Sequence, residues 1–217
     1  MRGDTTDPAD QIIRLLMKLR SGGITDARLL KALERVTRAA FTPPAYKDLA
    51  YEDCVLPAES GQILEKPSML ALMLQAMALP AKPDVRVLNV GAGSGYSSAL
   101  LSVMGAHVFA VERLHSLVKS AEQNLSEGRY ENIRINCSNG LEGWTEHAPY
   151  KNILLQGLIK NIPQTLFDQL TPDGTLIAPQ KKKSGIKLVK YDAKGEKIWS
   201  QPALFYAQLK TGVSKAL

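Results

Sequence analysis

A short apolar strand that runs directly into three closely spaced glycines constrains the fold of this chain most. Residues 85–90 read Val-Arg-Val-Leu-Asn-Val, and Gly91-Ala92-Gly93-Ser94-Gly95-Tyr96 follow at once. A helical pattern then covers residues 97–104. Glycine lets the backbone turn sharply and lets a ligand approach the main chain. This order of strand, glycine loop and helix favours the first βα turn of an open α/β sheet.

The same alternation continues along the chain. Strand patterns lie at 107–112, 132–137, 152–156 and 175–178, and helical patterns lie at 114–127 and 163–170. Short apolar strands that alternate with helices predict a doubly wound, mostly parallel sheet of the α/β class, similar to the Rossmann fold. After residue 185 the pattern changes to an antiparallel hairpin, with strands at 186–191 and 197–199. Residues 204–209 are compatible with one further strand.

The first 80 residues differ, because their apolar residues recur at helical spacing. We expect a first helix over 11–21 and a second helix that begins at Thr25. A third helix is expected over 69–78, with Pro67 at its start. Residues 45–66 show no strong period and are predicted to form a loop-rich connector. The predicted organisation is therefore a helical cap with its connector (1–80) and an α/β domain with a C-terminal hairpin (81–217), together forming one structural unit.

Composition excludes several classes of protein. Of the 217 residues, 45% are apolar and 22% are charged, as in ordinary soluble domains. No stretch approaches the roughly 18 apolar residues of a membrane span, and the N-terminus does not resemble a secretory signal. We therefore expect a cytoplasmic protein that does not bind membranes. Cys54 and Cys137 form no paired motif and the three histidines have no ligand spacing, so no metal site is predicted.

The net charge of +6 is concentrated in one segment. Residues 181–200 contain seven lysines and only two acidic residues. Lysines protect exposed sheet edges from pairing, so a solvated edge is the simplest interpretation. This segment has no recognisable reading helix, and its only aromatic residues are Tyr191 and Trp199, so we do not expect it to bind duplex nucleic acid. A contact surface for an acidic partner remains the alternative.

An acidic residue at the end of the second predicted strand indicates the kind of ligand. Glu112 follows Gly91 by 21 positions, where a carboxylate can accept hydrogen bonds from two ribose hydroxyls. A dinucleotide fingerprint would have glycine or alanine at position 96, where this chain has Tyr96. The loop instead resembles the S-adenosylmethionine loop of class I methyltransferases. A dinucleotide, or a tight turn without a ligand, is the alternative.

The resemblance extends along nearly the whole chain. The chain is similar to the protein-L-isoaspartate O-methyltransferase family, whose segments "R-D-L-A-Y-x-D", "G-Q-T-I-S-Q-P", "G-T-G-S-G-Y" and "T-V-E-R" have counterparts in order. Those counterparts are Lys47 to Asp53, Gly61 to Pro67, Gly91 to Tyr96 and Ala110 to Arg113. Further matches are Gly23 to Asp26, Leu33 to Val36, Ala40 to Pro43, Glu146 to Tyr150, Ile162-Pro163 and the segment from Asp168 to Gly174.

This resemblance implies a fold, a cofactor and a reaction. The fold is the doubly wound sheet with an N-terminal helical cap and an added C-terminal hairpin. The reaction is the methylation of isoaspartyl carboxylates in damaged proteins or peptides, with S-adenosylmethionine as donor and S-adenosylhomocysteine as product. The positions that match the family's cofactor site are Gly91, Ala92, Gly93, Ser94, Gly95, Tyr96, Glu112, Arg113, Asn139 and Gly140.

Several positions that match the family's active-site and cofactor-binding residues depart from the family pattern. Glu65 stands where the family has its active-site serine, and we take it as the candidate catalytic residue. Asn89 replaces the usual acid before the glycine loop, and Asn139 replaces the aspartate expected to hold the adenine amine. Gln156 and Gly157 stand in a segment that is small and alanine-rich in the family.

Glu65 matters because the reaction uses a carboxylate nucleophile. A serine hydroxyl can donate a hydrogen bond to that carboxylate, whereas an ionised glutamate only accepts. Two carboxylates about 4 Å apart repel by roughly 4 kcal/mol at an effective dielectric of about 20. Efficient isoaspartyl methylation is therefore not expected unless Glu65 stays protonated or turns outward.

Three functions compete at this point. The first is methylation of isoaspartyl carboxylates, as in the family. The second is methyl transfer to a changed substrate, with Glu65 as general base for a hydroxyl or an amine. The third is a binding module that holds the cofactor, or nothing, and acts through its lysine-rich edge.

Overall fold

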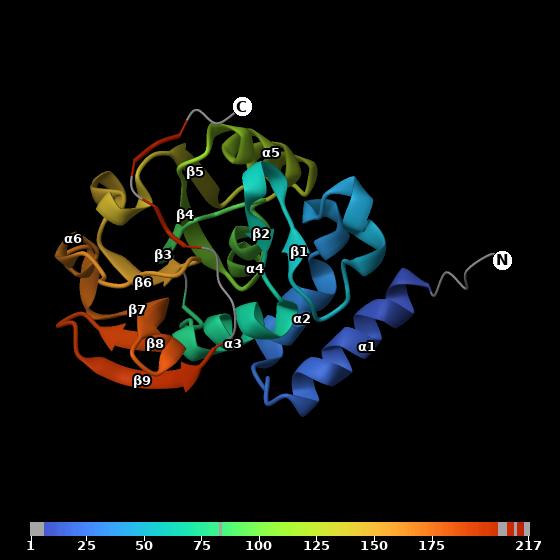
Figure 1. Cartoon of the computed structure of the whole chain (residues 1–217), viewed down its shortest axis with the longest axis horizontal. Coiled ribbons are helices and arrows are strands. Elements are labelled where there is room, and N and C mark those ends of the chain that lie inside the picture. The colour runs from blue at the N-terminus through green and yellow to red at the C-terminus, as the bar shows by residue number, and fades with distance from the viewer. Residues whose placement is uncertain (1–6, 83, 204–207, 211, 215–217) are drawn as a thin grey trace.

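The computed structural model describes residues 7–82, 84–203, 208–210 and 212–214, and its centre is one seven-stranded sheet. The strand order is β5-β4-β3-β6-β7-β8-β9. The strands are β3 (Val85–Val90), β4 (Ala106–Glu112), β5 (Ile133–Cys137), β6 (Tyr150–Leu155), β7 (Leu170–Lys182), β8 (Gly185–Asp192) and β9 (Lys197–Pro202). The first five in this order are mutually parallel, and β8 and β9 pair antiparallel. The predicted doubly wound sheet with a C-terminal hairpin is confirmed (Figure 1).

The chain order places a crevice between two of these strands. From β3 the chain adds β4 and β5 on one side, and it then returns to place β6 and β7 on the other side. At such a switch point the loops after neighbouring strands diverge and leave space for a ligand. The carboxyl ends of β3 and β6 thus bring the loop at Gly91 and the turn at Gln156 together. The backbone N–H of Gln156 donates to the carbonyl of Val90 over 2.8 Å.

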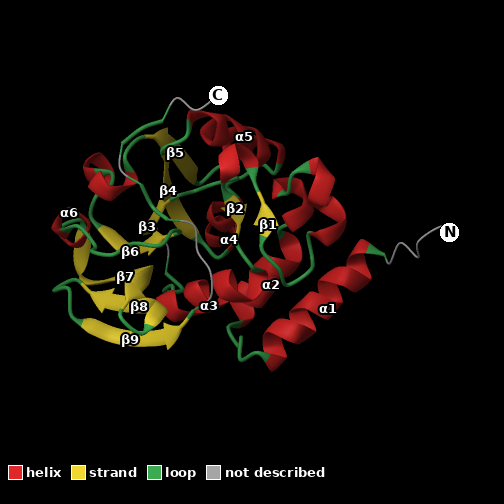
Figure 2. Cartoon of the chain, viewed as in Figure 1, coloured by secondary structure: helices red, strands yellow, loops and turns green. Residues whose placement is uncertain are grey.

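Helices cover both faces of the sheet. They are α1 (Pro8–Ser21), α2 (Ala27–Arg35), α3 (Pro67–Met77), α4 (Tyr96–Val103), α5 (His115–Glu127) and α6 (Gln164–Phe167). The 3₁₀ turns are Arg38–Phe41, Pro44–Leu49, Glu59–Gly61, Gly140–Glu142 and Thr145–His147. Figure 2 shows the C-terminal strands at one end of the molecule and α1 and α2 at the other. None of the helices in the described part of the chain has the length and apolar character needed to cross a bilayer.

The N-terminal helices form where the periodicity placed them, with shifted starts, and α1 begins at Pro8 and not at residue 11. The second helix is capped by Asp26 and not by Thr25, since the Asp26 carboxylate accepts from the N–H groups of Arg28 and Leu29. The backbone N–H of Thr25 donates instead to Oε1 of Gln75 on α3, over 2.7 Å. Residues 45–66 are largely irregular, as predicted, and contain the short pair β1 (Leu56–Pro57) and β2 (Ile63–Leu64).

Two predicted boundaries in the C-terminal half are wrong. The helix predicted at 163–170 is only α6, because Gln169 and Leu170 pair with the start of β6. The strand predicted at 175–178 runs from Leu170 to Lys182, because β7 pairs with the start of β6 at Leu170 and continues beyond β6 along β8. In both places a pairing partner distant in sequence decided the backbone conformation. The strand suggested at 204–209 falls mostly on residues outside the described ranges, and Gln208 forms a single bridge with Leu158.

One hydrophobic cluster joins the N-terminal helices to the sheet. It contains Leu29 and Leu33 of α2, Met73 of α3, and Leu100 of α4 together with Val108 of β4, all of them buried. Because burial of apolar surface is the main favourable term in folding, this shared core fixes the helical cap against the sheet. The connector between α2 and α3 is thereby held above the carboxyl ends of the strands.

Candidate active site

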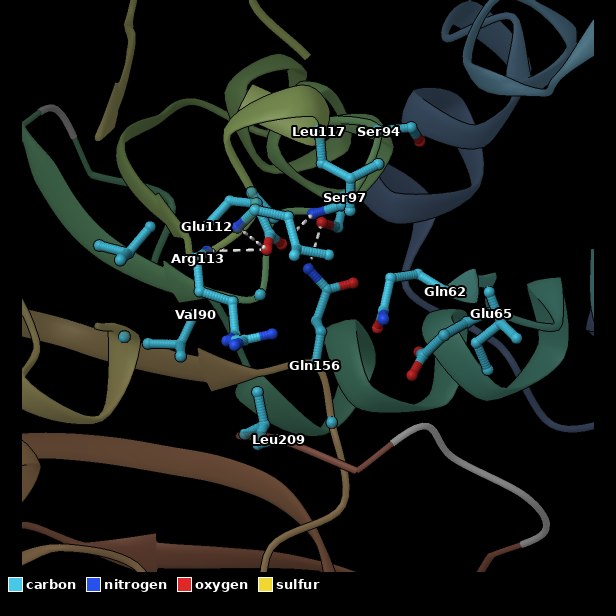
Figure 3. Close-up of a pocket in the computed structure, with 18 of the residues that line it drawn as sticks. Gln62, Glu65, Val90, Ser94, Ser97, Glu112, Arg113, Leu117, Gln156 and Leu209 are labelled. Carbon is cyan, nitrogen blue, oxygen red and sulfur yellow. Dashed lines mark hydrogen bonds between the residues drawn. The ribbon is translucent and has the colours of Figure 1, made fainter. Parts of the chain in front are cut away.

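A pocket opens at the carboxyl ends of β3, β4 and β6 (Figure 3). It encloses about 960 Å³ of space, part of it open to solvent. Its walls come from the glycine loop, the end of β4, the turn after β5, and the first residues after β6. The segment Gln62–Glu65 forms a further wall, and Gln208–Lys210 also line the pocket.

The glycine loop follows a backbone path that requires glycine. Gly91 has φ +82°, and a Cβ there would lie 3.3 Å from the carbonyl oxygen of Gln156. Gly93 has φ +56°, and a Cβ at that position would meet nothing within 4 Å. Positive φ favours glycine at both positions. The open space beside Gly93 lies in the pocket, so a ligand can contact the main chain there.

Glu112 lies at the end of β4 with its carboxylate fixed by backbone donors. Oε1 accepts from the N–H groups of Arg113 (2.7 Å) and Leu114 (3.0 Å), and Oε2 accepts from Gly93 N–H (3.1 Å). The residue is only 6% exposed and lines the pocket. A carboxylate has about four acceptor positions, so Oε2 keeps capacity for a donor from a ligand. This arrangement fits the ribose role predicted for Glu112.

Three other predicted residues of this wall differ in how their side chains are held. Tyr96 is buried against Phe41, with ring centres 5.5 Å apart, and burial raises the pKa of its hydroxyl. Arg113 uses its Nε to donate to the carbonyl of Gly212 over 3.1 Å, which ties the C-terminal segment beside the pocket. Ser94 has a buried Oγ without a hydrogen-bond partner among the residues described. All three line the pocket together with Ala92 and Gly93. Gly95 is not among the lining residues, and a Cβ there would meet Leu125 and Ala121 of α5.

The turn after β5 contains the predicted adenine-side residues. Gly140 lines the pocket, and a Cβ there would lie 2.5 Å from Val90 Cγ1, so only glycine fits this close approach. Asn139 lies outside the residues that line the pocket. Its Nδ2 donates to Glu142 over 2.7 Å, and its Oδ1 accepts from Leu141 N–H over 3.3 Å. Its predicted contact with adenine stays a prediction.

Glu65 directly follows β2 and lines the pocket opposite Glu112 (Figure 3). The buried guanidinium of Arg38 holds the main chain here, because Nη2 donates to the Glu65 carbonyl over 2.8 Å. The Oε2 atom of Glu65 is buried, and it has no hydrogen-bond partner in the part of the chain that the structure describes. Burial without a partner raises the pKa of the Glu65 carboxyl to about 8. At neutral pH the carboxyl therefore carries its proton.

Asp53, the last residue of the segment from Lys47 that matches the family, has a structural role. Asp53 caps α3, because its Oδ1 accepts from Ser68 N–H over 2.8 Å, and its Oδ2 lies 3.3 Å from Lys66 Nζ. It is not among the residues that line the pocket. Within the described ranges, no group of three or more histidine, cysteine or acidic side chains is arranged to hold a metal ion.

Gln156 and Gln62 both line the pocket, although neither was predicted from the sequence to be a site residue. Gln156 Nε2 donates to Oδ1 of the buried Asn89 over 2.7 Å and also to Ser97 Oγ. Its position directly after a parallel strand next to the glycine loop was the available signal. Its contacts could not be foreseen, because Asn89 lies 67 positions earlier.

The sheet topology, the glycine loop after β3 and the acid that ends β4 together define a Rossmann-like methyltransferase fold. Solved structures agree. A protein-L-isoaspartate O-methyltransferase superposes with a TM-score of 0.76 and 26% identity, over 91% of this chain and 65% of that longer chain. Another, described as a protein-L-isoaspartate O-methyltransferase from Plasmodium falciparum in complex with S-adenosyl-L-homocysteine, gives a TM-score of 0.79. It has 23% identity and covers 91% of this chain and 97% of that one.

Sequence comparisons give the family. The family model "Protein-L-isoaspartate(D-aspartate) O-methyltransferase (PCMT)" matches residues 11–207. The protein-L-isoaspartate O-methyltransferase of Maricaulis maris (strain MCS10) is 37% identical over 191 residues, which are 88% of this chain and 89% of the relative. The chain belongs to the protein-L-isoaspartate O-methyltransferase family.

Proposed function

We propose that this protein is an S-adenosylmethionine-dependent methyltransferase that methylates isoaspartyl carboxylates in damaged proteins or peptides. One observation carries the proposal: a single pocket joins the glycine loop and Glu112 to Glu65, the residue at the position of the family's serine. The membership of the family and the relatives named above support the same reaction.

The residues present fit the cofactor. The open space at Gly93 leaves room beside the main chain, and Oε2 of Glu112 can accept from a ribose hydroxyl. Gly140 allows the turn after β5 to lie close to β3 where an adenine ring would bind. When bound, S-adenosylmethionine supplies an electrophilic methyl group. The remaining task of the protein is to orient the acceptor carboxylate toward it.

Glu65 can orient that carboxylate while it is protonated. Its raised pKa keeps it neutral at pH 7, and a neutral carboxyl has one O–H that can donate to a substrate oxygen. That is the hydrogen bond that the family's serine hydroxyl would supply. The repulsion expected from the sequence is thus removed by burial, which suppresses the charge on Glu65 and leaves the residue in the pocket.

A binding experiment tests the cofactor site. We expect calorimetry to detect S-adenosylhomocysteine binding to the wild-type chain, and Glu112→Ala to weaken it by about 1.5–3 kcal/mol for each hydrogen bond to the charged group that is lost. Glu112→Gln is the matched control, because it keeps the size of the side chain and one acceptor oxygen. Equal affinity in wild type and Glu112→Ala would contradict the ribose role of Glu112.

A second candidate function rests on the unpartnered Oε2 of Glu65. An acceptor that must lose a proton, such as an amine or a hydroxyl, requires a general base, and a carboxyl with a pKa near 8 is suited to that role at slightly alkaline pH. Methyl transfer would then require the ionised form of Glu65. Its rate would rise with pH through about 8, opposite to the expectation for a carboxylate acceptor.

A methyl-transfer assay separates the two candidates. We expect an isoaspartyl peptide to be methylated at pH 7 and the same peptide with ordinary aspartate to remain unmodified. Cofactor binding with no transfer to the isoaspartyl peptide at any pH would contradict the first candidate. That result would favour either methyl transfer to a different substrate or a module that only binds the cofactor.

A further inference from the structure

Gln156 is the first residue after β6, and its side chain points into the pocket (Figure 3). It lies beside Ser97 of α4 and the glycine loop, on the wall opposite Gln62 and Glu65. A long polar side chain in this position reduces the space at one end of the pocket. Its hydrogen bonds decide which polar atom it presents to a ligand.

Those hydrogen bonds fix the orientation of the amide. Both hydrogens of Gln156 Nε2 are used, one toward Asn89 Oδ1 (2.7 Å) and one toward Ser97 Oγ. Asn89 is fully buried, and its own Nδ2 donates to Ser97 Oγ (2.9 Å) and Ser98 Oγ (2.8 Å). A buried polar network with its donors paired is rigid, because breaking any bond leaves a buried group unsatisfied. With Nε2 held by the network, Oε1 of Gln156 faces the pocket (Figure 3).

The order of the strands shows which part of a ligand meets this oxygen. Across the sheet the order is β5, β4, β3, β6, so the pocket wall runs from Gly140 through Glu112 and the glycine loop to Gln156. With a ribose at Glu112 and an adenine beside Gly140, the amino-acid end of the cofactor extends along the glycine loop toward Gln156. That end carries one ammonium and one carboxylate.

The two charges are distinguished by the groups that face them. The first turn of α4 presents N–H groups that have no acceptor within the helix, and these suit the carboxylate. An amide oxygen only accepts, so Gln156 Oε1 suits the ammonium. Asn89 is neutral where the family usually has an acid, so its position supplies no negative charge. From this arrangement we infer that Gln156, held by Asn89 and Ser97, binds the α-ammonium of the cofactor through Oε1.

This inference rests on the proposed cofactor site and assigns a binding residue to it. Calorimetry with three ligands tests it: S-adenosylhomocysteine, its decarboxylated analogue S-adenosyl-3-thiopropylamine, and its deaminated analogue S-adenosyl-4-thiobutyrate. We expect Gln156→Ala to weaken the binding of S-adenosylhomocysteine and of the decarboxylated analogue by about 10- to 100-fold, as for the loss of a hydrogen bond to a charged group. Binding of the deaminated analogue should change less than threefold, so that ligand is an internal control for the fold of the variant.

The other outcomes have separate meanings. If Gln156→Ala weakens binding of the deaminated analogue and leaves binding of the decarboxylated analogue unchanged, Nε2 faces the ligand and the inference is overturned. Equal effects on all three ligands, or no effect on any, also overturn it while the cofactor site stands. No binding of S-adenosylhomocysteine to the wild-type chain overturns the proposed function and the inference together.

Discussion

Methyl transfer to an isoaspartyl peptide is expected to fall as the pH is raised, with a midpoint at or below about 8. The protonated Glu65 carboxyl can donate to the substrate carboxylate, whereas the ionised form repels it. With a pKa of about 8, roughly one tenth of Glu65 remains protonated at pH 9, which implies about a tenfold loss of kcat/KM. A positively charged cofactor favours the ionised form and shifts the midpoint downward.

Two substitutions isolate the contribution of Glu65 to this profile. Glu65→Gln keeps the shape and a donor but cannot ionise, and Glu65→Ser restores the hydroxyl at the family's position. Both variants should show a flat profile between pH 6 and 9.5, and both should exceed the wild type about tenfold at pH 9. At pH 6 the three proteins should agree within a few-fold. A wild-type profile that is flat over this range would contradict the hydrogen-bond role of Glu65.

Glu65 is also expected to make the stability of the fold depend on pH. Its pKa is about 8 in the folded chain and 4.5 as the ordinary value, so between these two pH values the folded state keeps a proton that the unfolded state has lost. Stability therefore falls as the pH rises through this window. At 1.36 kcal/mol for each unit of pKa difference, the full loss at pH 8 and above is about 5 kcal/mol as an upper bound.

Unfolding by urea at several pH values measures this effect. The free energy of unfolding of Glu65→Gln should exceed that of the wild type by several kcal/mol at pH 8, and the difference should disappear near pH 4.5. Glu52→Gln is the matched control, because Glu52 is exposed on the same connector and the substitution removes the same charge. A constant difference between Glu65→Gln and wild type across pH 4.5 to 8 would show that Glu65 ionises freely in the folded state.

The sequence by itself determined the order of the elements and the position of the cofactor loop. Alternating apolar strands and helices are local patterns, since a side chain's face in a strand or helix follows from its own spacing along the chain. The glycine loop and Glu112 could be located for the same reason, because a βα turn and the end of the next strand lie within one short unit. The helix predicted at 163–170 failed where Leu170 pairs with β6, a contact that local spacing does not contain.

Only the tertiary structure decided the chemistry of the pocket. The sequence placed Glu65 at the serine position and left open whether it is charged. The answer depends on the packing of residues far away in the chain, including Arg38, which holds the main chain at Glu65. Gln156 meets Asn89 only because β6 and β3 are neighbours in the sheet. Ionisation and amide orientation depend on burial and on non-local hydrogen bonds, so they become defined only when the strands assemble.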